Sequence, residues 1–229
     1  MSILTQKTIS KKISVEGIGI HTGLKVKLDI FPAQPNTGII FKRVDVKKNN
    51  IIIPAYNNVI DATLCTTISN DFGIKVSTIE HLMGAFYGLG IDNAIVELNS
   101  QEVPIMDGSA KEFVKLILEA GFQNSEAPIK LIKIEKEVEV IEGNKKISIN
   151  RSNVSLDIDF EIVYKNSLIK SQRNKVSVFE DNLKDIYNSR TFCLFEDLEK
   201  LKVLGLGKGG SLENALVVKD NLLMNEEGL

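Results

Sequence analysis

The chain has 229 residues, a net charge of -2, 43% hydrophobic residues and 25% charged residues. These proportions are typical of a soluble globular protein, and the length allows two modest domains, each with its own core. Acidic and basic residues are mixed, without a basic arm, which argues against nucleic-acid binding. We find no apolar run long enough to span a membrane and no signal peptide, so we expect no transmembrane segment and a cytoplasmic protein.

The two cysteines, Cys65 and Cys193, lie far apart in the sequence with no Cys-x-x-Cys spacing. This pattern favours reduced thiols over a disulfide framework.

The first hundred residues are predicted to be mostly strands joined by hairpins. Alternating or β-branched segments predict strands at 8–15, 25–30, 38–43, 51–54, 62–68, 74–76 and 93–98. Residues 17–23 form a glycine-rich turn that carries His21. The sequence gives His21 no partner, so it is either a polar loop residue or part of a site. Cys65 is most simply explained as a small buried residue.

Residues 77–85 set a carboxylate beside one of only two histidines, where a helix is predicted to begin. Ser77 and Glu80 have the spacing of a capping box, which gives Glu80 a structural function at the helix start. The alternative is that His81 binds a metal and Glu80 acts as a general base. Adjacent helical residues point about 100° apart, so they would flank one ion and further ligands would come from distant sequence. The local pattern alone favours the structural function.

A second capping box, Ser109 with Glu112, predicts another helix that ends at Gly121. Asp107, just before it, is either a loop carboxylate with a chemical function or an N-terminal capping carboxylate, and the pattern favours the latter. The first domain is therefore expected to have several strands with two helices on one face.

We expect a domain boundary in the polar stretch 123–128, which ends in a proline. Beyond it, the pattern predicts strands at 129–141, 146–149 and 154–164, a helix from residue 178, an extended segment at 189–194, a helix at 195–201 and a strand at 215–218. Residues 205–210 formally match the dinucleotide fingerprint G-x-G-x-x-G. We reject that match because a helix, rather than a strand, precedes it.

Several separated motifs then agree, in order, with one family. They are Gly-Ile-Gly-Ile-His-Thr-Gly at 17–23, Leu-Cys-Thr at 64–66, Ser-Thr-Ile-Glu-His-Leu at 77–82, Gly-Leu-Gly-Ile-Asp-Asn at 88–93, Val-Pro-Ile-Met-Asp-Gly-Ser at 103–109, Arg-Thr-Phe at 190–192, Gly-Gly-Ser at 209–211 and Asn-Glu-Glu-Gly-Leu at 225–229. In these motifs the chain resembles the zinc-dependent UDP-3-O-acyl-N-acetylglucosamine deacetylases of lipid A synthesis.

The resemblance implies an α+β fold of two similar domains, 1–123 and 129–229, each a mainly antiparallel sheet packed on two α-helices, with the active site between them. It implies that Glu80 is the general base, that His81 is a ligand of Zn²⁺ and that the Thr191 hydroxyl binds the oxyanion.

The resemblance also implies a substrate site. Phe192 would lie beside the sugar, Tyr164 would stack on uracil, and the insert 194–217 would hold the acyl chain, although its apolar residues would serve equally well as an ordinary core. The expected substrate-binding residues are Cys65, Tyr164, Phe192, Leu194, Leu198, Gly210, Ser211, Ala215 and Val217.

The sequence departs from the family in two respects. The family's other two zinc ligands, at His-x-x-x-Asp spacing, and its acid histidine lie downstream of the motif that ends this chain at Leu229, and His21 matches a loop position rather than a ligand. The chain therefore reads as cut short at its C-terminus, with poor zinc retention and little turnover expected. Residues 162–167 also lack the acid and the histidine of the family's Ile-Asp-Phe-x-His-Pro stretch.

Three functions are consistent with the residues: a hydrolase, a nucleotide-sugar and acyl-chain binding module without catalysis, and a structural protein with no site. We expect the first. The expected reaction is hydrolysis of the N-acetyl group of UDP-linked acylated N-acetylglucosamine, a small-molecule substrate, by a monomer.

Overall fold

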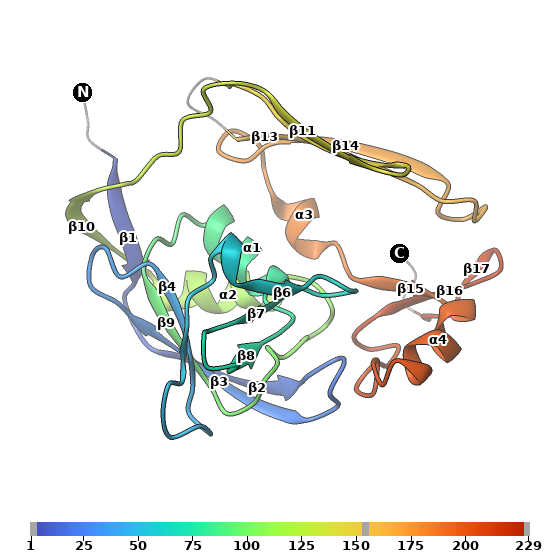
Figure 1. Ribbon diagram of the computed structural model, residues 1–229, viewed down its shortest axis with the longest axis horizontal. Coiled ribbons are helices and arrows are strands. Elements are labelled where there is room, and N and C mark those ends of the chain that lie inside the picture. The colour runs from blue at the N-terminus through green and yellow to red at the C-terminus, as the bar shows by residue number, and fades with distance from the viewer. Residues whose placement is uncertain (1–3, 153–155, 227–229) are drawn as a thin grey trace.

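The computed structural model describes residues 4–152 and 156–226. In the first part of the chain the strands are β1 (Thr5–Ile9), β2 (Ile13–Ile18), β3 (Lys25–Pro32), β4 (Ile39–Arg43), β5 (Ile51–Ile52), β6 (Val59–Asp61), β7 (Thr67–Ser69), β8 (Lys75–Val76) and β9 (Ala94–Leu98). The helices are the short 3-10 helix η1 (Tyr56–Asn58), α1 (Glu80–Gly88) and α2 (Lys111–Ala120). Figure 1 shows the sheets with α1 and α2 beside them.

The main sheet has five strands in the order β2-β3-β9-β4-β5. Its pairs are antiparallel except β4 with β9, which run parallel. Along β3, Val26, Leu28 and Ile30 are buried while Lys25 and Lys27 are exposed, as expected for a sheet with one face in the core.

Helix α2 packs on this core through Phe113, Val114, Ile117 and Ala120. The large hydrophobic cluster draws all its buried members from the segment between Ile9 and Ala120. The first part of the chain therefore has a core of its own, which holds the strands and helices around α1 in place.

The predicted strands 25–30, 38–43 and 93–98 are confirmed, whereas two others are wrong in extent. The strand expected at 8–15 is two strands, because β1 pairs with β10 (Phe122–Pro128) while β2 pairs with β3. The strand expected at 62–68 is formed only from Thr67 onward, since Leu64 has a left-handed φ of 65° that a strand cannot accommodate.

The stretch 123–128, where we expect a domain boundary, is not an irregular segment. It lies in β10, which pairs antiparallel with β1 from Thr5↔Pro128 to Ile9↔Phe122. Its polar residues suit this position because the strand pairs with β1 alone and most of its residues are exposed.

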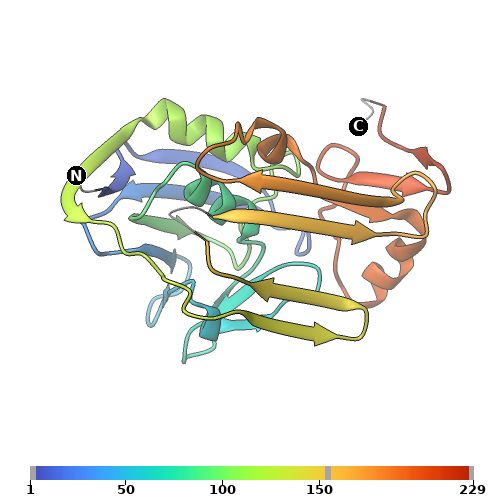
Figure 2. The ribbon, with the colours of Figure 1, turned by 90° about the horizontal axis from the view of Figure 1, so that it is seen from above.

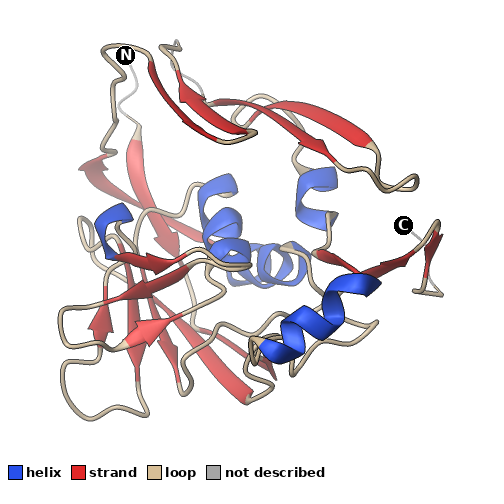
Figure 3. Ribbon diagram, turned by 45° about the vertical axis from the view of Figure 1, so that its right-hand side comes forward, coloured by secondary structure: helices blue, strands red, loops and turns tan. Residues whose placement is uncertain are grey.

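The later elements are β11 (Val138–Glu142), β12 (Lys145–Ile149), β13 (Asp157–Val163), β14 (Ser171–Ser177), α3 (Lys184–Asn188), β15 (Phe192–Leu194), η2 (Phe195–Asp197), α4 (Leu198–Val203), β16 (Leu216–Lys219) and β17 (Leu222–Leu223). β11–β12 and β13–β14 are separate antiparallel hairpins that lie side by side (Figure 2), and every residue of β11 and β12 is exposed. β15, β16 and β17 form a third sheet beside α4, in which β15 and β16 are parallel (Figure 3).

Two expectations for this part are corrected. The strand expected at 129–141 begins only at Val138, and the helix expected from residue 178 begins at Lys184. Residues 177–181 close a turn instead, because Ser177 O accepts the Asp181 N–H and the Asp181 carboxylate accepts the Ser177 N–H. Val154, the predicted start of the strand at 154–164, lies outside the described residues, as do residues 227–229 of the last motif.

The fold is thus mixed α+β with mainly antiparallel strand pairs. Among the described residues, none of the helices has the length and apolar character needed to cross a membrane.

Candidate active site

The turn before α1 does not form the predicted capping box. The Ser77 hydroxyl donates to Gln101 O at 3.1 Å, and the N-cap residue of α1 is Ile79, with no side-chain cap. The backbone of Ser77 also pairs with the segment 101–103. The Ser77 N–H donates to Gln101 O, and the Val103 N–H donates to Ser77 O. Glu80 is therefore not engaged in closing the helix start.

The second predicted capping box is also wrong. The N-cap of α2 is Ala110, again without a side-chain cap. The Asp107 carboxylate accepts the Ser109 N–H at 3.0 Å and the Ser109 hydroxyl at 2.7 Å, and Ser109 Oγ accepts the Lys111 N–H. Asp107 thus closes the turn ahead of α2 rather than capping the first free N–H groups of the helix.

Glu80 is placed by the first turn of α1. Its Oε2 accepts the backbone N–H of Thr66 at 3.1 Å, which joins α1 to the turn that carries Cys65. Glu80 also lines a mainly apolar pocket of about 250 Å³, whose other walls are Pro54, Ala55, Tyr56, Val59, Thr66, Ile68, Ile79 and Met83. A carboxylate in such surroundings has an acceptor oxygen beside space that a small molecule can enter.

His81, the next residue, is half-buried. Burial lowers the pKa of its imidazole below the ordinary value of 6.5, against the opposing effects of the Glu80 and Asp107 charges. The imidazole is therefore neutral at neutral pH, which is the state that binds a metal ion.

His21 lies near Cys65, which the sequence did not reveal. The interaction with the Cys65 thiol is the largest of the causes that raise the pKa of His21, whose buried Nδ1 atom has no hydrogen-bond partner among the described residues. Burial raises the pKa of Cys65, but the interactions with His21, Thr67 and Thr78 outweigh it, so the pKa of the thiol is lowered. The predicted substrate-binding residue Cys65 thus lies in the turn before β7, next to His21.

Thr191 is fixed beside the loop that carries Asp107. Its N–H donates to Gly108 O at 2.7 Å, and its carbonyl accepts the Leu216 N–H at 2.9 Å. The Arg190 side chain donates to Asp107 O at 2.7 Å and to Glu213 O at 2.6 Å. These contacts hold Thr191 beside residues 107 and 108, and the Asp107 charge is one of those that act on the pKa of His81.

Gly108 allows the loop that carries Asp107 to approach the backbone of Asn214 closely. It has a φ of +87°, and a Cβ at this position would lie 2.2 Å from Asn214 O. Only glycine combines this backbone conformation with so close a contact.

The remaining predicted substrate residues gather around β15 and β16. The Tyr164 and Phe192 rings pack edge to face with centroids 5.6 Å apart. Leu194 and Leu198 are half-buried, while Ala215 and Val217 are buried. Gly210 and Ser211 are exposed, and the Ser211 N–H donates to the Asn214 side chain at 2.8 Å.

Sequence reasoning missed Glu102, whose side chain is fully buried and accepts hydrogen bonds from His21, Thr22 and Thr78. The one available signal was a single carboxylate directly before the apolar run 103–105. Sequence reasoning also missed that the Arg190 side chain donates a hydrogen bond to Asp107 O.

A complete metal site is not present in the part of the chain that the structure describes. Within residues 4–152 and 156–226, no three His, Cys, Asp or Glu side chains converge as ligands. His81 has the right chemistry for one ligand, but a catalytic zinc ion takes three from the protein. The described residues therefore do not fit a full zinc centre.

A carboxylate beside a neutral imidazole is a pair of groups typical of hydrolytic enzymes. The family model described as UDP-3-O-acyl N-acetylglycosamine deacetylase matches residues 6–229. The chain therefore belongs to the UDP-3-O-acyl N-acetylglycosamine deacetylase family.

Three curated relatives carry the name UDP-3-O-acyl-N-acetylglucosamine deacetylase. The protein of Teredinibacter turnerae is 46% identical over 234 residues, which is 99% of this chain and 75% of the relative. That of Myxococcus xanthus is 43% identical over 232 residues, 100% of this chain and 72% of the relative. That of Haemophilus ducreyi is 40% identical over 230 residues, 99% of this chain and 75% of the relative.

Proposed function

We propose that this protein hydrolyses the N-acetyl group of UDP-3-O-acyl-N-acetylglucosamine and releases acetate, a step of lipid A synthesis. Membership of the family supports this reaction. The observation that carries it to particular residues is the position of Glu80, which does not cap its helix and lies beside a neutral His81 at the edge of a pocket.

Glu80 is proposed as the general base. An amide is a poor electrophile and water a poor nucleophile, so a base that takes the proton of the attacking water lowers the barrier. The Thr66 N–H occupies one of the carboxylate's acceptor positions and orients the group, while further lone pairs remain for the water.

Thr191 is proposed as the donor to the oxyanion. Its backbone N–H and carbonyl are both held by other backbone groups, so its hydroxyl is not needed for these contacts. A hydroxyl fixed in this way stabilises negative charge that develops on the amide oxygen.

His81 is proposed as one ligand of the Zn²⁺ that the family resemblance implies. A bound zinc ion polarises a carbonyl and acidifies water. Since the described residues supply one suited ligand, the steps above are assigned to Glu80 and Thr191 alone.

The proposed substrate site lies around β15 and β16. Tyr164 and Phe192, whose rings are in contact, would hold uracil and sugar. The insert 194–217, with Leu194, Leu198, Ala215 and Val217, would hold the acyl chain, and Gly210, Ser211 and Cys65 would complete the site. The same proposal includes two domains, 1–123 and 129–229, with the site between them, and a cytoplasmic monomer.

The reaction can be tested directly. The full chain, supplied with Zn²⁺, is incubated with UDP-3-O-acyl-N-acetylglucosamine, and the free amine and acetate are measured by mass spectrometry. We expect equal amounts of the two products, at a slow rate because the described residues do not complete the metal site. Binding of the nucleotide sugar without acetate release would contradict the proposal and favour a binding module instead.

A further inference from the structure

Glu102 is hydrogen-bonded to Thr78, two residues before Glu80. Its side chain is fully buried, and it takes part in none of the ion pairs among the described residues. A buried carboxylate without a cation persists only when hydrogen bonds replace its hydration. Glu102 accepts four such bonds. Oε1 accepts the His21 N–H and the Thr78 hydroxyl, both at 2.9 Å, and Oε2 accepts the Thr22 N–H at 2.8 Å and the Thr22 hydroxyl at 2.6 Å.

The first group held by Glu102 is the turn before α1. Thr78 is β-branched, yet it has a left-handed φ of 57°. This conformation costs on the order of 1–3 kcal/mol for such a residue and persists only where its surroundings enforce it. The Glu102 side chain and the backbone bonds of Ser77 to residues 101 and 103 provide that enforcement. The turn fixes the direction in which α1 starts, two residues before Glu80.

The second group held by Glu102 is the glycine-rich loop 17–23. A Cβ on Gly19 would lie 2.3 Å from Glu102 Oε2, so the loop can close over this carboxylate only with glycine there. The backbone N–H of His21 and the backbone N–H and hydroxyl of Thr22 then donate to the carboxylate. The backbone of His21 is thereby fixed.

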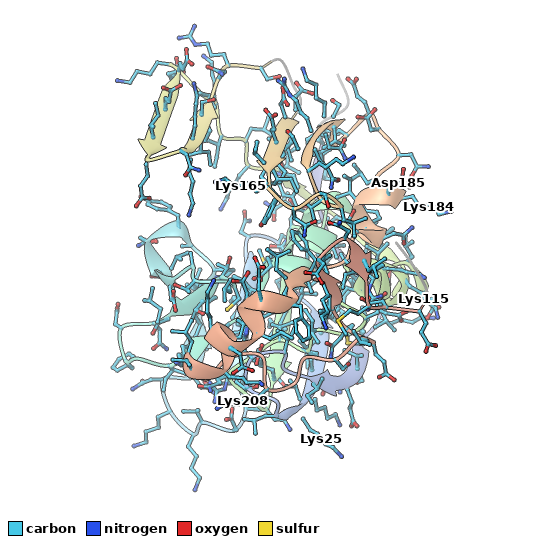
Figure 4. The ribbon with its side chains drawn as sticks, turned by 90° about the vertical axis from the view of Figure 1, so that its right-hand side faces the viewer. Lys25, Lys115, Lys165, Lys184, Asp185 and Lys208 are labelled. Atoms are coloured by element: carbon cyan, nitrogen blue, oxygen red, sulfur yellow. The ribbon has the colours of Figure 1, made fainter. Side chains whose placement is uncertain are left out.

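The same loop supports the glycine segment of the second part of the chain. Gly209 N donates to Ile20 O at 3.0 Å, and Lys208 N donates to His21 O at 3.4 Å. Lys208 is labelled in Figure 4. A Cβ on Gly209 would lie 2.3 Å from Gly19 O, so the two loops touch through their backbones. Gly210 and Ser211 follow directly.

We propose that Glu102 is a positioning residue for the reaction. One buried carboxylate fixes both the turn that aims Glu80 and His81 and the loop on which the Gly209–Gly210 segment rests. Its effect on turnover rests on the proposed function, because it acts through the base and the substrate segment and touches no substrate itself. Its effect on the two loops is independent of that function.

Glu102→Gln tests this proposal with almost no change in shape. The amide has one acceptor oxygen and an NH₂ donor, so in either orientation two of the four donors lose their acceptor. We expect the backbone amide that faces the new NH₂ group, that of His21 or that of Thr22, to exchange hydrogen faster, while the amides of β3 and β9 stay protected. We expect turnover with Zn²⁺ to fall on the order of tenfold to a hundredfold, as for a base that is displaced without being removed.

Asn93→Ala is the matched control. Asn93 is also buried and joins distant segments, since its side chain donates to Gln6 and accepts the Gly38 N–H. This variant should lower the melting temperature without altering turnover or selectively exposing the His21 and Thr22 amides. If Glu102→Gln behaves like Asn93→Ala in both measurements, Glu102 is only a stabilising residue and the proposal is overturned.

A double-mutant cycle with Thr78→Val tests the link to the turn before α1. Thr78→Val removes the hydroxyl that Glu102 accepts and keeps the branched shape. If both residues act through one contact, the double variant loses no more turnover than the worse single variant. Losses that multiply would show that Glu102 does not act through Thr78.

Two further outcomes remain interpretable. If Glu102→Gln does not fold, Thr22→Val removes one of the four bonds and leaves the backbone donors in place, and a selective rise in exchange at residues 21 and 22 is again expected. If the unmodified protein shows no turnover, the proposed function fails, while the exchange pattern still decides whether Glu102 orders the two loops.

Discussion

Glu80 Oε2 accepts the Thr66 backbone N–H at 3.1 Å, across an interval of 14 residues. The Ser77-x-x-Glu80 pattern predicts a different bond, from Glu80 back to the Ser77 N–H, but that N–H donates to Gln101 O. The carboxylate is therefore held against the turn that carries Cys65, at the edge of a pocket. Glu80 therefore does not have the capping function that the pattern predicts, and its carboxylate is left for a chemical function.

Thr191→Val should remove the proposed oxyanion donor without disturbing the fold. Valine has the same shape, and the fixed contacts of Thr191 are those of its N–H and carbonyl. We expect kcat to fall on the order of a hundredfold or more, as for loss of one oxyanion donor. Thr191→Ser, which keeps a hydroxyl, should recover most of the rate. Equal rates for the valine and serine variants would refute this function of the hydroxyl.

The two histidines should titrate on opposite sides of the ordinary value of 6.5 in the metal-free protein. Burial lowers the pKa of His81, and the interaction with Cys65 raises that of His21. NMR resolves the two imidazoles, because the chain has only two histidines. A titration midpoint for His81 above that for His21 would be inconsistent with the arrangement described.

The same shifts predict how stability depends on pH. His81 has a lowered folded pKa, so the unfolded chain binds more protons below pH 6.5 and stability should fall as the pH drops through that range. His21 has a raised folded pKa, so its contribution is fully present below pH 6.5 and is lost as the pH rises through the folded value. Urea unfolding at several pH values should show a shallower acid loss in His81→Gln than in the unmodified chain.

Gly108→Ala should break the contact that brings Thr191 to the Asp107 loop. The new Cβ would lie 2.2 Å from Asn214 O, in addition to the strain of a φ of +87°. Gly38→Ala is the control for strain alone, since Gly38 has a φ of +70° and no atom within 4 Å of the added Cβ. We expect Gly38→Ala to cost about 1 kcal/mol and Gly108→Ala clearly more, with loss of turnover. Unfolding free energies that match in the two variants would contradict the close approach.

Tyr164→Ala should raise KM for the UDP-linked substrate more than it lowers kcat. The Tyr164 ring packs on Phe192 and, in the proposed site, would stack on uracil rather than contact the amide that is broken. Tyr164→Phe keeps the ring and should bind nearly as well. A variant in which kcat alone falls would place Tyr164 outside the nucleotide site.

The sequence predicted the hairpins of the first part and the position of α1, because alternation and helical spacing are local signals. It failed where tertiary contacts override local chemistry. Ser77 and Ser109 have capping-box spacing. However, the Ser77 hydroxyl donates to Gln101 O and the Ser109 hydroxyl donates to the Asp107 carboxylate.

Part of the candidate site could likewise be predicted. Motifs single out Glu80, His81 and Thr191, whose functions stay predictions, whereas the closeness of His21 to Cys65 and the burial of Glu102 depend on long-range packing. Glu102 accepts hydrogen bonds from His21 and Thr22, which precede it in the sequence by 81 and 80 positions. No periodic pattern encodes contacts between residues so far apart.

The most direct test of the account compares acetate release from UDP-3-O-acyl-N-acetylglucosamine by the unmodified chain and by Glu80→Gln, both supplied with Zn²⁺. The glutamine oxygen can still accept the Thr66 N–H, so the unfolding free energy should be nearly unchanged. Without a base, the rate should fall on the order of 10²–10⁴-fold. Glu97→Gln, which removes only the ion pair with Lys42, should keep the full rate. Undiminished acetate release by Glu80→Gln would contradict the account.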